Sequence, residues 1–471
     1  MPVEQIYTGC LAEAAYFIHS NGEAAVVDPL RETTPYITRA ADNGVKIKYI
    51  FLTHFHADFV SGHVDLAKKT GATIVYGPSA TADFDFHEAH DGEVFKIGDI
   101  TLELMHTPGH TMESISLVYI NEEGKKEFVM TGDVLFIGDV GRPDLAVKSD
   151  LSQADLAGHL FDSLRNKVMK LPDDIIVYPN HGAGSACGKN MSEETFDTLG
   201  HQKEVNYALR ADMTKEEFVK EVLTGLVTPP QYFPKNAGMN KGINKSYADI
   251  LASGLQAHDP AEFKGLMEST DGIIILDTRH EQIFKDAFVP NTYNFNIDDN
   301  FAPWVGAVIL DIEAPILIIA DEGREEEVVT RLARVGYDNA IGYLKGGIDA
   351  WKEAGYETDS IISISPKELK VKMMGKINIV DVRKESEYYS EHVDADNVYN
   401  RPLDFINKNI EEYDANEEYY LHCVGGYRSM IAASILRANG IKNVIDIAGG
   451  FNDIKEAGVK VTEYVCPTTM L

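Results

Sequence analysis

The stretch FLTHFHADFVSGH, residues 51–63, decides the fold expected for the first half of the chain. It begins with the end of an apolar strand, expected over 48–53, and places His54, His56 and Asp58 in the loop that follows. The same order, a strand and then a polar residue suited to metal binding, recurs at three later places, which supply His110, Asp133 and His181. Loops at strand ends bring such residues together, so the pattern predicts a metal site at one edge of a sheet.

In their order and spacing, these residues resemble the metal-binding motifs of the metallo-β-lactamase superfamily. The resemblance covers the first half of the chain and implies an α/β fold, an αββα sandwich of two sheets between layers of helices. One position departs from the pattern, because Phe59 stands where dinuclear hydrolases of the superfamily carry a histidine for the second metal. Phenylalanine cannot bind a metal, so we expect a site for one metal ion.

Within the superfamily, the stretches THFHADFVSGH, TPGHT and TGDVLFIGDVGRPDL resemble those of persulfide dioxygenases, which are mononuclear non-haem iron enzymes. The resemblance implies one Fe(II) per chain, bound by His54, His110 and Asp133. Two imidazoles and one carboxylate leave coordination positions open, as Fe(II) enzymes that use O₂ require. Such mixed nitrogen and oxygen ligands would also accept zinc, so the choice of iron rests on the resemblance.

Around these ligands, the resemblance places His56, Asp58 and His181 as residues that orient the ligands and water. Cys187, which follows His181 after six residues, and Arg142 are candidates for the wall of the substrate pocket. Cys187 either handles a persulfide or only lines the wall, and the sequence leaves both roles open.

The second half of the chain contains an internal repeat. IIILDTRHEQIF matches INIVDVRKESEY, and GGIDAWKEAG matches GGFNDIKEAG further along. Both copies alternate apolar strands with stretches of helical periodicity, which predicts two α/β modules with mostly parallel sheets. The segment 228–244, rich in Pro, Gly and Asn, predicts a linker or a lid. We therefore expect domains at 1–240, 241–357 and 358–471, with boundaries good to a few residues.

The loop HCVGGYRS, residues 422–429, joins an expected strand to an expected helix in the second copy. Its glycines free backbone N–H groups to point at the sulfur of Cys423, and the helix N-terminus favours the thiolate. Arg428 would supply a cation for an anionic sulfur substrate. The repeat and this loop resemble rhodanese domains, which carry sulfur as an enzyme persulfide, so we expect Cys423 to be the nucleophile. Only four residues separate Cys423 from Arg428, whereas phosphatase relatives of the fold use a longer loop around phosphate.

The first copy lacks these residues. Aligning its stretch PILIIADEGREEEVV with the second copy puts Asp321 at the position of the cysteine and Glu326 near that of the arginine. Neither side chain can carry sulfur, and the acidic loop repels sulfite and thiosulfate. We expect an inactive rhodanese-like domain that serves spacing, assembly or docking. A new role for Asp321 as a catalytic acid is the alternative.

The composition excludes several classes of partner. The chain has 471 residues, of which 44% are hydrophobic, and its formal net charge at pH 7 is −31. Such an acidic surface repels phosphate backbones and anionic lipid, so we expect neither nucleic acid nor a membrane as a partner. The four cysteines show no C-x-x-C spacing, and MPVEQIYTGC at the start shows no secretory signal. These features indicate a multidomain cytoplasmic protein, and we expect a homo-oligomer.

Together the motifs predict a two-site sulfur enzyme. The resemblance implies that the first domain uses O₂ to oxidise the sulfane sulfur of a small thiol persulfide, such as that of glutathione or coenzyme A, to sulfite. Cys423 would then transfer sulfur from a second persulfide to sulfite and form thiosulfate, as in sulfide detoxification. Two alternatives stay open: a dizinc thioester hydrolase like glyoxalase II joined to a sulfurtransferase domain, and a non-catalytic sulfur carrier.

Overall fold

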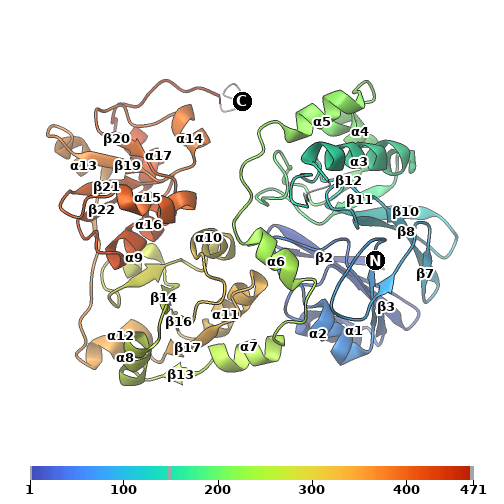
Figure 1. Cartoon of the computed structure of the whole chain (residues 1–471), viewed down its shortest axis with the longest axis horizontal. Coiled ribbons are helices and arrows are strands. Elements are labelled where there is room, and N and C mark those ends of the chain that lie inside the picture. The colour runs from blue at the N-terminus through green and yellow to red at the C-terminus, as the bar shows by residue number, and fades with distance from the viewer. Residues whose placement is uncertain (1–2, 147–150, 467–471) are drawn as a thin grey trace. The chain divides into compact units, whose positions relative to one another are not determined.

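The structure, a computed structural model, describes residues 3–146 and 151–466 (Figure 1). The chain divides into two compact units, one formed by Met1–Tyr247 with Ala333–Gly336 and the other by Ala248–Leu332 with Tyr337–Leu471. Within the described residues, no helix is both long enough and apolar enough to cross a membrane.

Two six-stranded sheets form the framework of the first unit. The first sheet has the order β1-β2-β3-β4-β5-β6, with β1 Val3–Thr8, β2 Glu13–Ser20, β3 Glu23–Val27, β4 Lys46–Phe51, β5 Thr73–Tyr76 and β6 His87–Glu88. The second has the order β12-β11-β10-β9-β8-β7, with β7 Val94–Ile97, β8 Ile100–His106, β9 Ile115–Ile120, β10 Lys126–Gly132, β11 Ile176–Pro179 and β12 Asp197–Thr198. The helices are α1 Thr34–Asp42, α2 His63–Thr70, α3 Gln153–Asn166, α4 Leu199–Val205, α5 Lys215–Leu223 and α6 Phe233–Met239.

Strand β4 shows how these elements form layers. Its neighbouring residues Ile50 and Phe51 point to opposite faces, Ile50 into the core beneath α1 and α2 and Phe51 into the core between the sheets. In β10 of the second sheet, Val129 packs with α3 while Met130 faces the first sheet. A strand buried on both faces is apolar throughout, which is why KYIFLT lacks alternation. The order of helices, sheet, sheet and helices confirms the predicted αββα sandwich.

Two copies of a five-stranded parallel sheet form the second unit and confirm the internal repeat. The first copy has the order β13-β17-β16-β14-β15, with β13 Ala257–His258, β14 Ile274–Asp277, β15 Thr292–Asn294, β16 Ile316–Ile319 and β17 Ala340–Leu344. The second repeats it as β18-β22-β21-β19-β20, with β18 Ile362–Ile364, β19 Asn378–Asp381, β20 Val398–Asn400, β21 Tyr419–His422 and β22 Val444–Ile447.

Helices cover both of these sheets. They are α7 Tyr247–Gly254, α8 Pro260–Ser269, α9 Glu281–Phe284, α10 Phe301–Val308, α11 Glu325–Arg334 and α12 Gly347–Glu353, then α13 Pro366–Lys372, α14 Glu385–Ser390, α15 Ile406–Asn409, α16 Tyr427–Ala438 and α17 Gly450–Glu456. Helix α16 differs from the others because nine of its twelve residues are buried. Its own sheet covers one side, and β15 of the first copy covers another, where the Asn294 N–H donates to Oγ of Ser434 over 3.0 Å.

Candidate active sites

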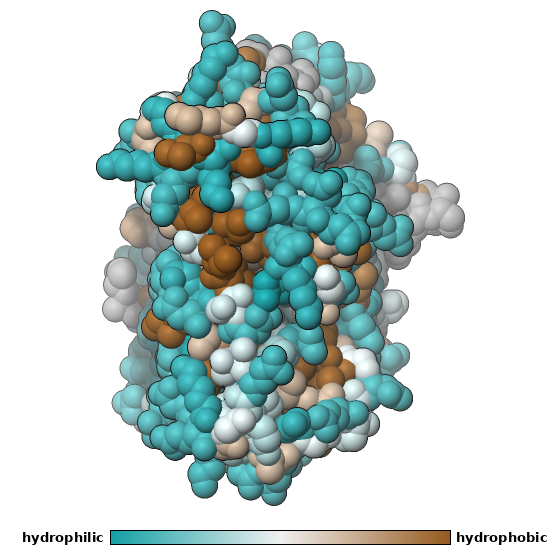
Figure 2. Space-filling view, turned by 90° about the vertical axis from the view of Figure 1, so that its left-hand side faces the viewer, coloured by the Kyte–Doolittle hydropathy of each residue, from teal (hydrophilic) through white to brown (hydrophobic). Residues whose placement is uncertain are grey.

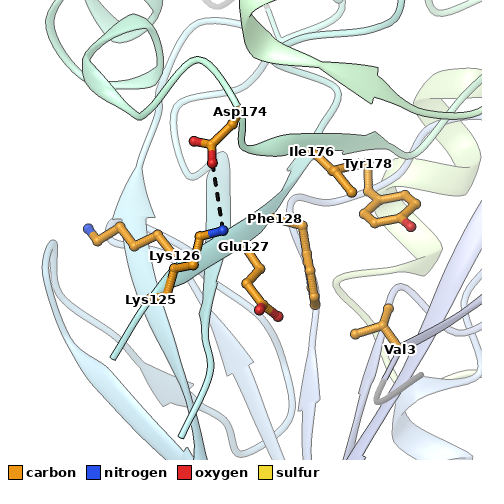
Figure 3. Close-up of a pocket in the computed structure, with 8 residues that line it drawn as sticks. All are labelled: Val3, Lys125, Lys126, Glu127, Phe128, Asp174, Ile176 and Tyr178. Atoms are coloured by element: carbon orange, nitrogen blue, oxygen red, sulfur yellow. Dashed lines mark ion pairs between the residues drawn. The ribbon is translucent and has the colours of Figure 1, made fainter. Parts of the chain in front are cut away.

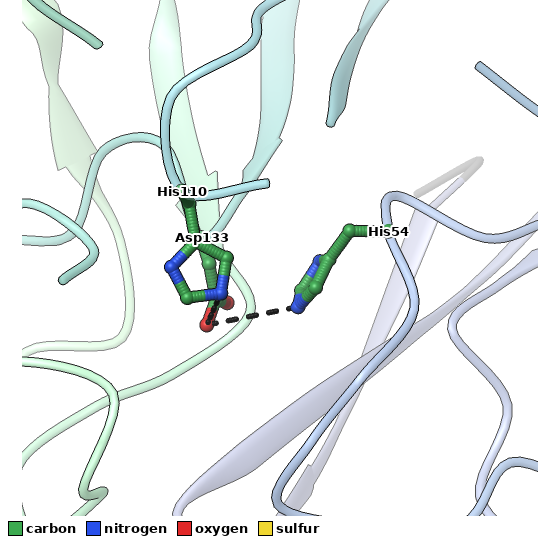
Figure 4. Close-up of side chains that lie close together, drawn as sticks. All are labelled: His54, His110 and Asp133. Carbon is green, nitrogen blue, oxygen red and sulfur yellow. Dashed lines mark ion pairs between the residues drawn. The ribbon is translucent and has the colours of Figure 1, made fainter. Parts of the chain in front are cut away.

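The structure brings His54, His110 and Asp133 together in the first unit (Figure 4). One potential ligand atom of each side chain lies within 4.8 Å of the others. Nε2 of His110 is 3.5 Å and Nε2 of His54 is 3.9 Å from Oδ2 of Asp133. The three side chains are buried and belong to the loops that follow β8, β4 and β10, so one edge of the sandwich gathers them.

Hydrogen bonds at the far ring nitrogens fix both imidazoles. Nδ1 of His54 lies 3.0 Å from Oγ1 of Thr53, and Nδ1 of His110 lies 2.8 Å from the carbonyl oxygen of Arg142. The Nε2 atoms are thereby left facing Asp133. Burial, reinforced by the charges of neighbouring histidines, holds the pKa of His54 well below its usual range. His54 is therefore neutral, which is the form that binds a metal.

The side chains of His54, His110 and Asp133 are suited to binding a metal ion. Both carboxylate oxygens of Asp133 are buried, and neither has a hydrogen-bond partner among the described residues. A buried carboxylate without a partner is costly, and a cation between the three side chains removes that cost. Two imidazole nitrogens and one carboxylate suit a divalent transition metal such as iron or zinc.

His56, Asp58 and His181 form a second cluster next to the first. Nε2 of His181 lies 3.3 Å from Oδ2 of Asp58 and 3.5 Å from Oδ1 of Asp133, so Asp133 stands between the two clusters. Nε2 of His56 lies 2.9 Å from Oδ1 of Asp28, while its buried Nδ1 has no hydrogen-bond partner among the described residues. The ring of Phe59 lies over that of His56, with centroids 4.3 Å apart, and is fully buried.

Asp28 is a functional candidate that the motif comparison missed. Its carboxylate accepts hydrogen bonds from the N–H and Oγ1 of Thr53, both over 2.8 Å, and from Nδ2 of Asn180. With the His56 contact, these bonds tie the loop of His54 to the residue that precedes His181. Asp28 directly follows β3, so the rule of a strand followed by a polar residue could have found it.

Asn240 also supports the ligand loop. Its Nδ2 donates to the carbonyl oxygens of His56 and Phe59 over 2.8 and 2.7 Å, and its Oδ1 accepts from the Ser61 N–H over 2.8 Å. It belongs to segment 228–244, in which the structure forms helix α6. This part of the expected linker or lid is therefore packed against the ligand loop.

The two residues expected at the pocket wall lie in different surroundings. Sγ of Cys187 is within 4.8 Å of ligand atoms of Asp133 and His181, and burial, reinforced by the charges of Asp58 and Asp133, raises the pKa of its thiol. Arg142 makes a two-point ion pair with Asp144, with contacts of 2.6 and 2.7 Å. Its guanidinium also donates to two backbone carbonyls, so Arg142 holds loops together rather than offering a free cation.

A separate surface pocket lies at the other end of β10 from Asp133 (Figure 3). Phe128, Ile176 and Tyr178 line it, and Lys125 pairs with Asp174 at its rim over 3.6 Å. Its lining contains neither histidine nor cysteine, so it lacks the chemistry of the ligand cluster.

In the second unit, the Cys423 loop joins β21 to α16. Gly426 adopts a φ of 107°, a conformation that favours glycine, and its N–H donates to Sγ of Cys423 over 3.1 Å. The Phe451 N–H donates to the Cys423 carbonyl over 2.7 Å, which fixes the loop from the side of α17. Cys423 is only 2% exposed, and of the expected backbone contacts to its sulfur the described residues supply that of Gly426.

The charged residues around this loop form ion pairs. Arg428 binds Glu387 of α14 at two points, with Nη1–Oε2 at 2.7 Å and Nη2–Oε1 at 2.9 Å. Arg383 binds Asp381 through Nη2 and Oδ2 at 2.6 Å and lies over the ring of Phe451, 3.9 Å from its centroid. The sequence prediction of Arg428 as a cation did not foresee its carboxylate partner.

The strand register corrects the alignment of the first copy. Asp277 pairs with Ile319 in the first sheet, and Asp381 pairs with His422 in the second. Ala320 therefore stands at the position of Cys423, one residue before the Asp321 that we expected there. The placement of Asp321 was wrong by one residue, and the two stretches aligned without a gap from Pro315 and Glu418 also put Ala320 opposite Cys423. Alanine still provides no nucleophile.

Comparison with known proteins agrees with these two architectures. A model of the metallo-beta-lactamase superfamily matches residues 8–181, and a model of the rhodanese-like domain matches 259–354 and 365–457. The probable hydroxyacylglutathione hydrolase glo2 of Schizosaccharomyces pombe is 31% identical over 197 residues, which cover 41% of this chain and 72% of that protein. The human mitochondrial persulfide dioxygenase ETHE1 is 30% identical over 226 residues, which cover 47% and 80%.

One solved structure aligns with much of the chain. The crystal structure of a metallo-beta-lactamase from Staphylococcus aureus matches with a TM-score of 0.64 and 28% identity, and covers 73% of this chain and 98% of that one. The alignments with both relatives span more than two thirds of each relative. The chain thus belongs to the metallo-beta-lactamase superfamily, and two rhodanese-like domains follow its superfamily domain.

Proposed function

We propose that the first unit is a mononuclear iron persulfide dioxygenase and that Cys423 is the nucleophile of a sulfurtransferase on the same chain. The observation that carries this proposal is the convergence of His54, His110 and Asp133 while Nε2 of His56 is bound to Asp28. Three ligands then face one point, which leaves the coordination positions that a substrate and O₂ need. An Fe(II) ion held by these residues would supply the redox chemistry with O₂.

The proposed first reaction converts one persulfide, one O₂ and one water into a thiol, sulfite and two protons. The sulfane sulfur is oxidised, and O₂ is reduced. The chain's own part is to hold the ligands in place and to exclude bulk water, because all three side chains are buried. Cys187, also buried beside Asp133, lines the space in which the persulfide would lie.

The proposed second reaction uses the Cys423 thiolate. It attacks the outer sulfur of a second persulfide, forms a new S–S bond and releases the carrier thiolate. Sulfite then attacks the outer sulfur of the Cys423 persulfide, which forms thiosulfate and regenerates the Cys423 thiolate. The Gly426 N–H, 3.1 Å from Sγ, stabilises negative charge on the sulfur in both steps.

A thioester hydrolase with two metal ions is the second candidate. The cluster of His56, Asp58 and His181 beside Asp133 favours it, because these side chains could hold another ion. The likeness to a probable hydroxyacylglutathione hydrolase points the same way. Phe59 opposes it, since it replaces a potential ligand with a buried apolar ring.

Anaerobic purification followed by metal analysis separates the two candidates. The proposal predicts one iron per chain and O₂ uptake that depends on glutathione persulfide. Two zinc ions per chain with hydrolysis of a glutathione thioester and no O₂ uptake would establish the hydrolase instead. The variant Phe59→His is a useful comparison, because it should raise the metal content above that of the natural chain.

A further inference from the structure

Glu387 forms an ion pair with Arg428 of the Cys423 loop. The Arg428 guanidinium uses two of its N–H groups on the Glu387 carboxylate, and both side chains are partly buried, at 16% and 31% exposure. Oε2 of Glu387 also accepts from the Lys384 N–H over 3.1 Å, which anchors the carboxylate at the start of α14. The pair is thus held in place from the side of Glu387.

Other cations near the loop are neutralised in the same way. A surface pocket lined by Arg383, Glu387, Glu391, Phe451 and Lys455 adjoins the loop, because Phe451 is hydrogen-bonded to the Cys423 carbonyl. Arg383 pairs with Asp381, and Lys455 pairs with Glu391. Each of these cations is therefore already paired with a carboxylate and is not a free positive charge for a substrate anion.

We propose that Glu387 is a specificity-determining residue of the Cys423 site, where it neutralises Arg428 and thereby weakens the binding of small inorganic anions. An organic persulfide, which can use the pocket for its carrier group, is then favoured over thiosulfate as the sulfur donor. This inference rests on the proposed role of Cys423 as a sulfur-carrying nucleophile. The same neutralisation lets the thiosulfate product leave the site readily, since the product faces an ion pair and not a free guanidinium.

An anion that approaches Cys423 meets two opposite charges, the Arg428 guanidinium and the Glu387 carboxylate. A free guanidinium beside the sulfur would attract a dianion strongly, because screening is weak at a partly buried site. The carboxylate of Glu387 cancels most of this attraction at the distance of an approaching anion. The carrier group of an organic persulfide makes its contacts in the pocket and away from Arg428, so it loses less from the same neutralisation than small anions do, sulfite included.

Glu387→Gln tests this directly, with Glu385→Gln as the matched control. Glutamine keeps the size of the side chain and an oxygen that can cap the helix, but it removes the charge. Glu385 lies on the same helix, is exposed and forms no ion pair that the structure shows. The full-length chain is treated with iodoacetate or iodoacetamide, which differ mainly in charge, and alkylation at Cys423 is followed by peptide mass spectrometry.

We expect Glu387→Gln to raise the iodoacetate-to-iodoacetamide rate ratio at Cys423 by about tenfold, and Glu385→Gln to change it by less than about twofold. The KM for thiosulfate should fall in Glu387→Gln by a similar factor, while the KM for glutathione persulfide stays nearly constant. Equal ratios in the two variants would overturn the proposal. A loss of reactivity toward both reagents would also overturn it, because Glu387 would then only position Arg428.

The natural chain gives a further check that needs no variant. Its alkylation ratio at Cys423 should lie near that of a free thiol in solution, whereas a ratio strongly favouring iodoacetate would show an unneutralised Arg428. The alkylation measurements do not depend on sulfur transfer. An absence of sulfurtransferase activity would therefore reject the proposed function while leaving the role of Glu387 to be decided by the ratios.

Discussion

Asp28 connects the loops of the candidate metal site, although it is not one of the three proposed ligands. It accepts from Thr53 and Asn180 and pairs with His56, so it connects the loop after β4 to the loop after β11. Residues that orient ligands in this way commonly change metal affinity when they are replaced. Asp28 has a φ of 50°, a left-handed conformation that Asp adopts more readily than most residues.

Asp28→Asn should lower the affinity for iron or zinc by about tenfold to a hundredfold. The NH2 of the new amide would face either the Thr53 N–H, which donates to Oδ1, or the Asn180 side-chain amide, which donates to Oδ2, so one donor would lose its acceptor in either orientation. Competition with a chelator measures the affinity. Asp42→Asn, an exposed position on α1, is the control and should leave it unchanged. An Asp28→Asn chain with natural affinity would show that the network does not hold the ligands.

At the scale of elements, α16 is the helix on which the second site depends. It carries Arg428 in its first turn and is covered by its own sheet and by β15 of the first copy. Asn407 of α15 also donates to the Val308 carbonyl of the first copy over 2.7 Å. A copy without a nucleophile thus still contributes packing to the copy that has one.

Ser434→Ala tests this packing. It leaves the buried Asn294 N–H without its acceptor, and such a loss typically costs about 1 to 3 kcal/mol. We expect the urea midpoint of the second unit to fall accordingly, while Ser269→Ala, at an exposed position, should cost less than about 0.5 kcal/mol. Equal midpoints for the two variants would contradict a supporting role of β15.

Asp446 on β22 gives the second unit a predictable dependence on pH. It lies between Oγ of Ser363 at 2.9 Å and Oγ of Ser429 at 2.8 Å, and burial raises its pKa to about 6. In the unfolded chain its pKa is about 3.9. Between these values the folded state holds a proton that the unfolded state has released, so stability is lost as the pH rises from about 4 to about 6.

The size of this loss is up to about 3 kcal/mol, the equivalent of two pKa units. Asp446→Asn should abolish it, because the amide stays neutral throughout. Unfolding in urea at pH 4.5 and pH 6.5 compares the natural chain with this variant and with the exposed Asp396→Asn as control. If Asp446→Asn and the natural chain keep the same difference in stability at both pH values, Asp446 does not titrate in this range.

The sequence allowed a better prediction of local features than of pairings across the fold. His54, His110 and Asp133 were identifiable because each lies in the loop after a strand and matches a motif of the superfamily, and the two parallel sheets because the repeat preserves its strands. Glu387 could not be predicted, since it lies 41 residues before Arg428 and only the fold brings them together. The position of Ala320 opposite Cys423, by contrast, could be read from the gapless alignment of the two copies, and the strand pairing agrees with it.

At the scale of the whole molecule, the surface seen in one view is mostly hydrophilic. Figure 2 shows a face covered largely by hydrophilic side chains, with smaller hydrophobic patches among them. The chain has a net charge of −31, so only local positive charge can attract a small anionic substrate. Near the Cys423 loop, Arg428 and Arg383 are each paired with a carboxylate. Charge on this chain therefore acts through individual ion pairs and not through a broad positive surface.

The ratio of O₂ consumed to glutathione persulfide consumed shows whether oxidation and sulfur transfer occur on the same chain. In the natural chain, one persulfide is oxidised and a second donates its sulfur to the sulfite, so the account predicts one O₂ for every two persulfides, with thiosulfate as the product. In Cys423→Ser the transfer is lost but oxidation continues, so the prediction is one O₂ for each persulfide, with sulfite as the product. No O₂ uptake in either protein, or the same ratio in both, would contradict the account.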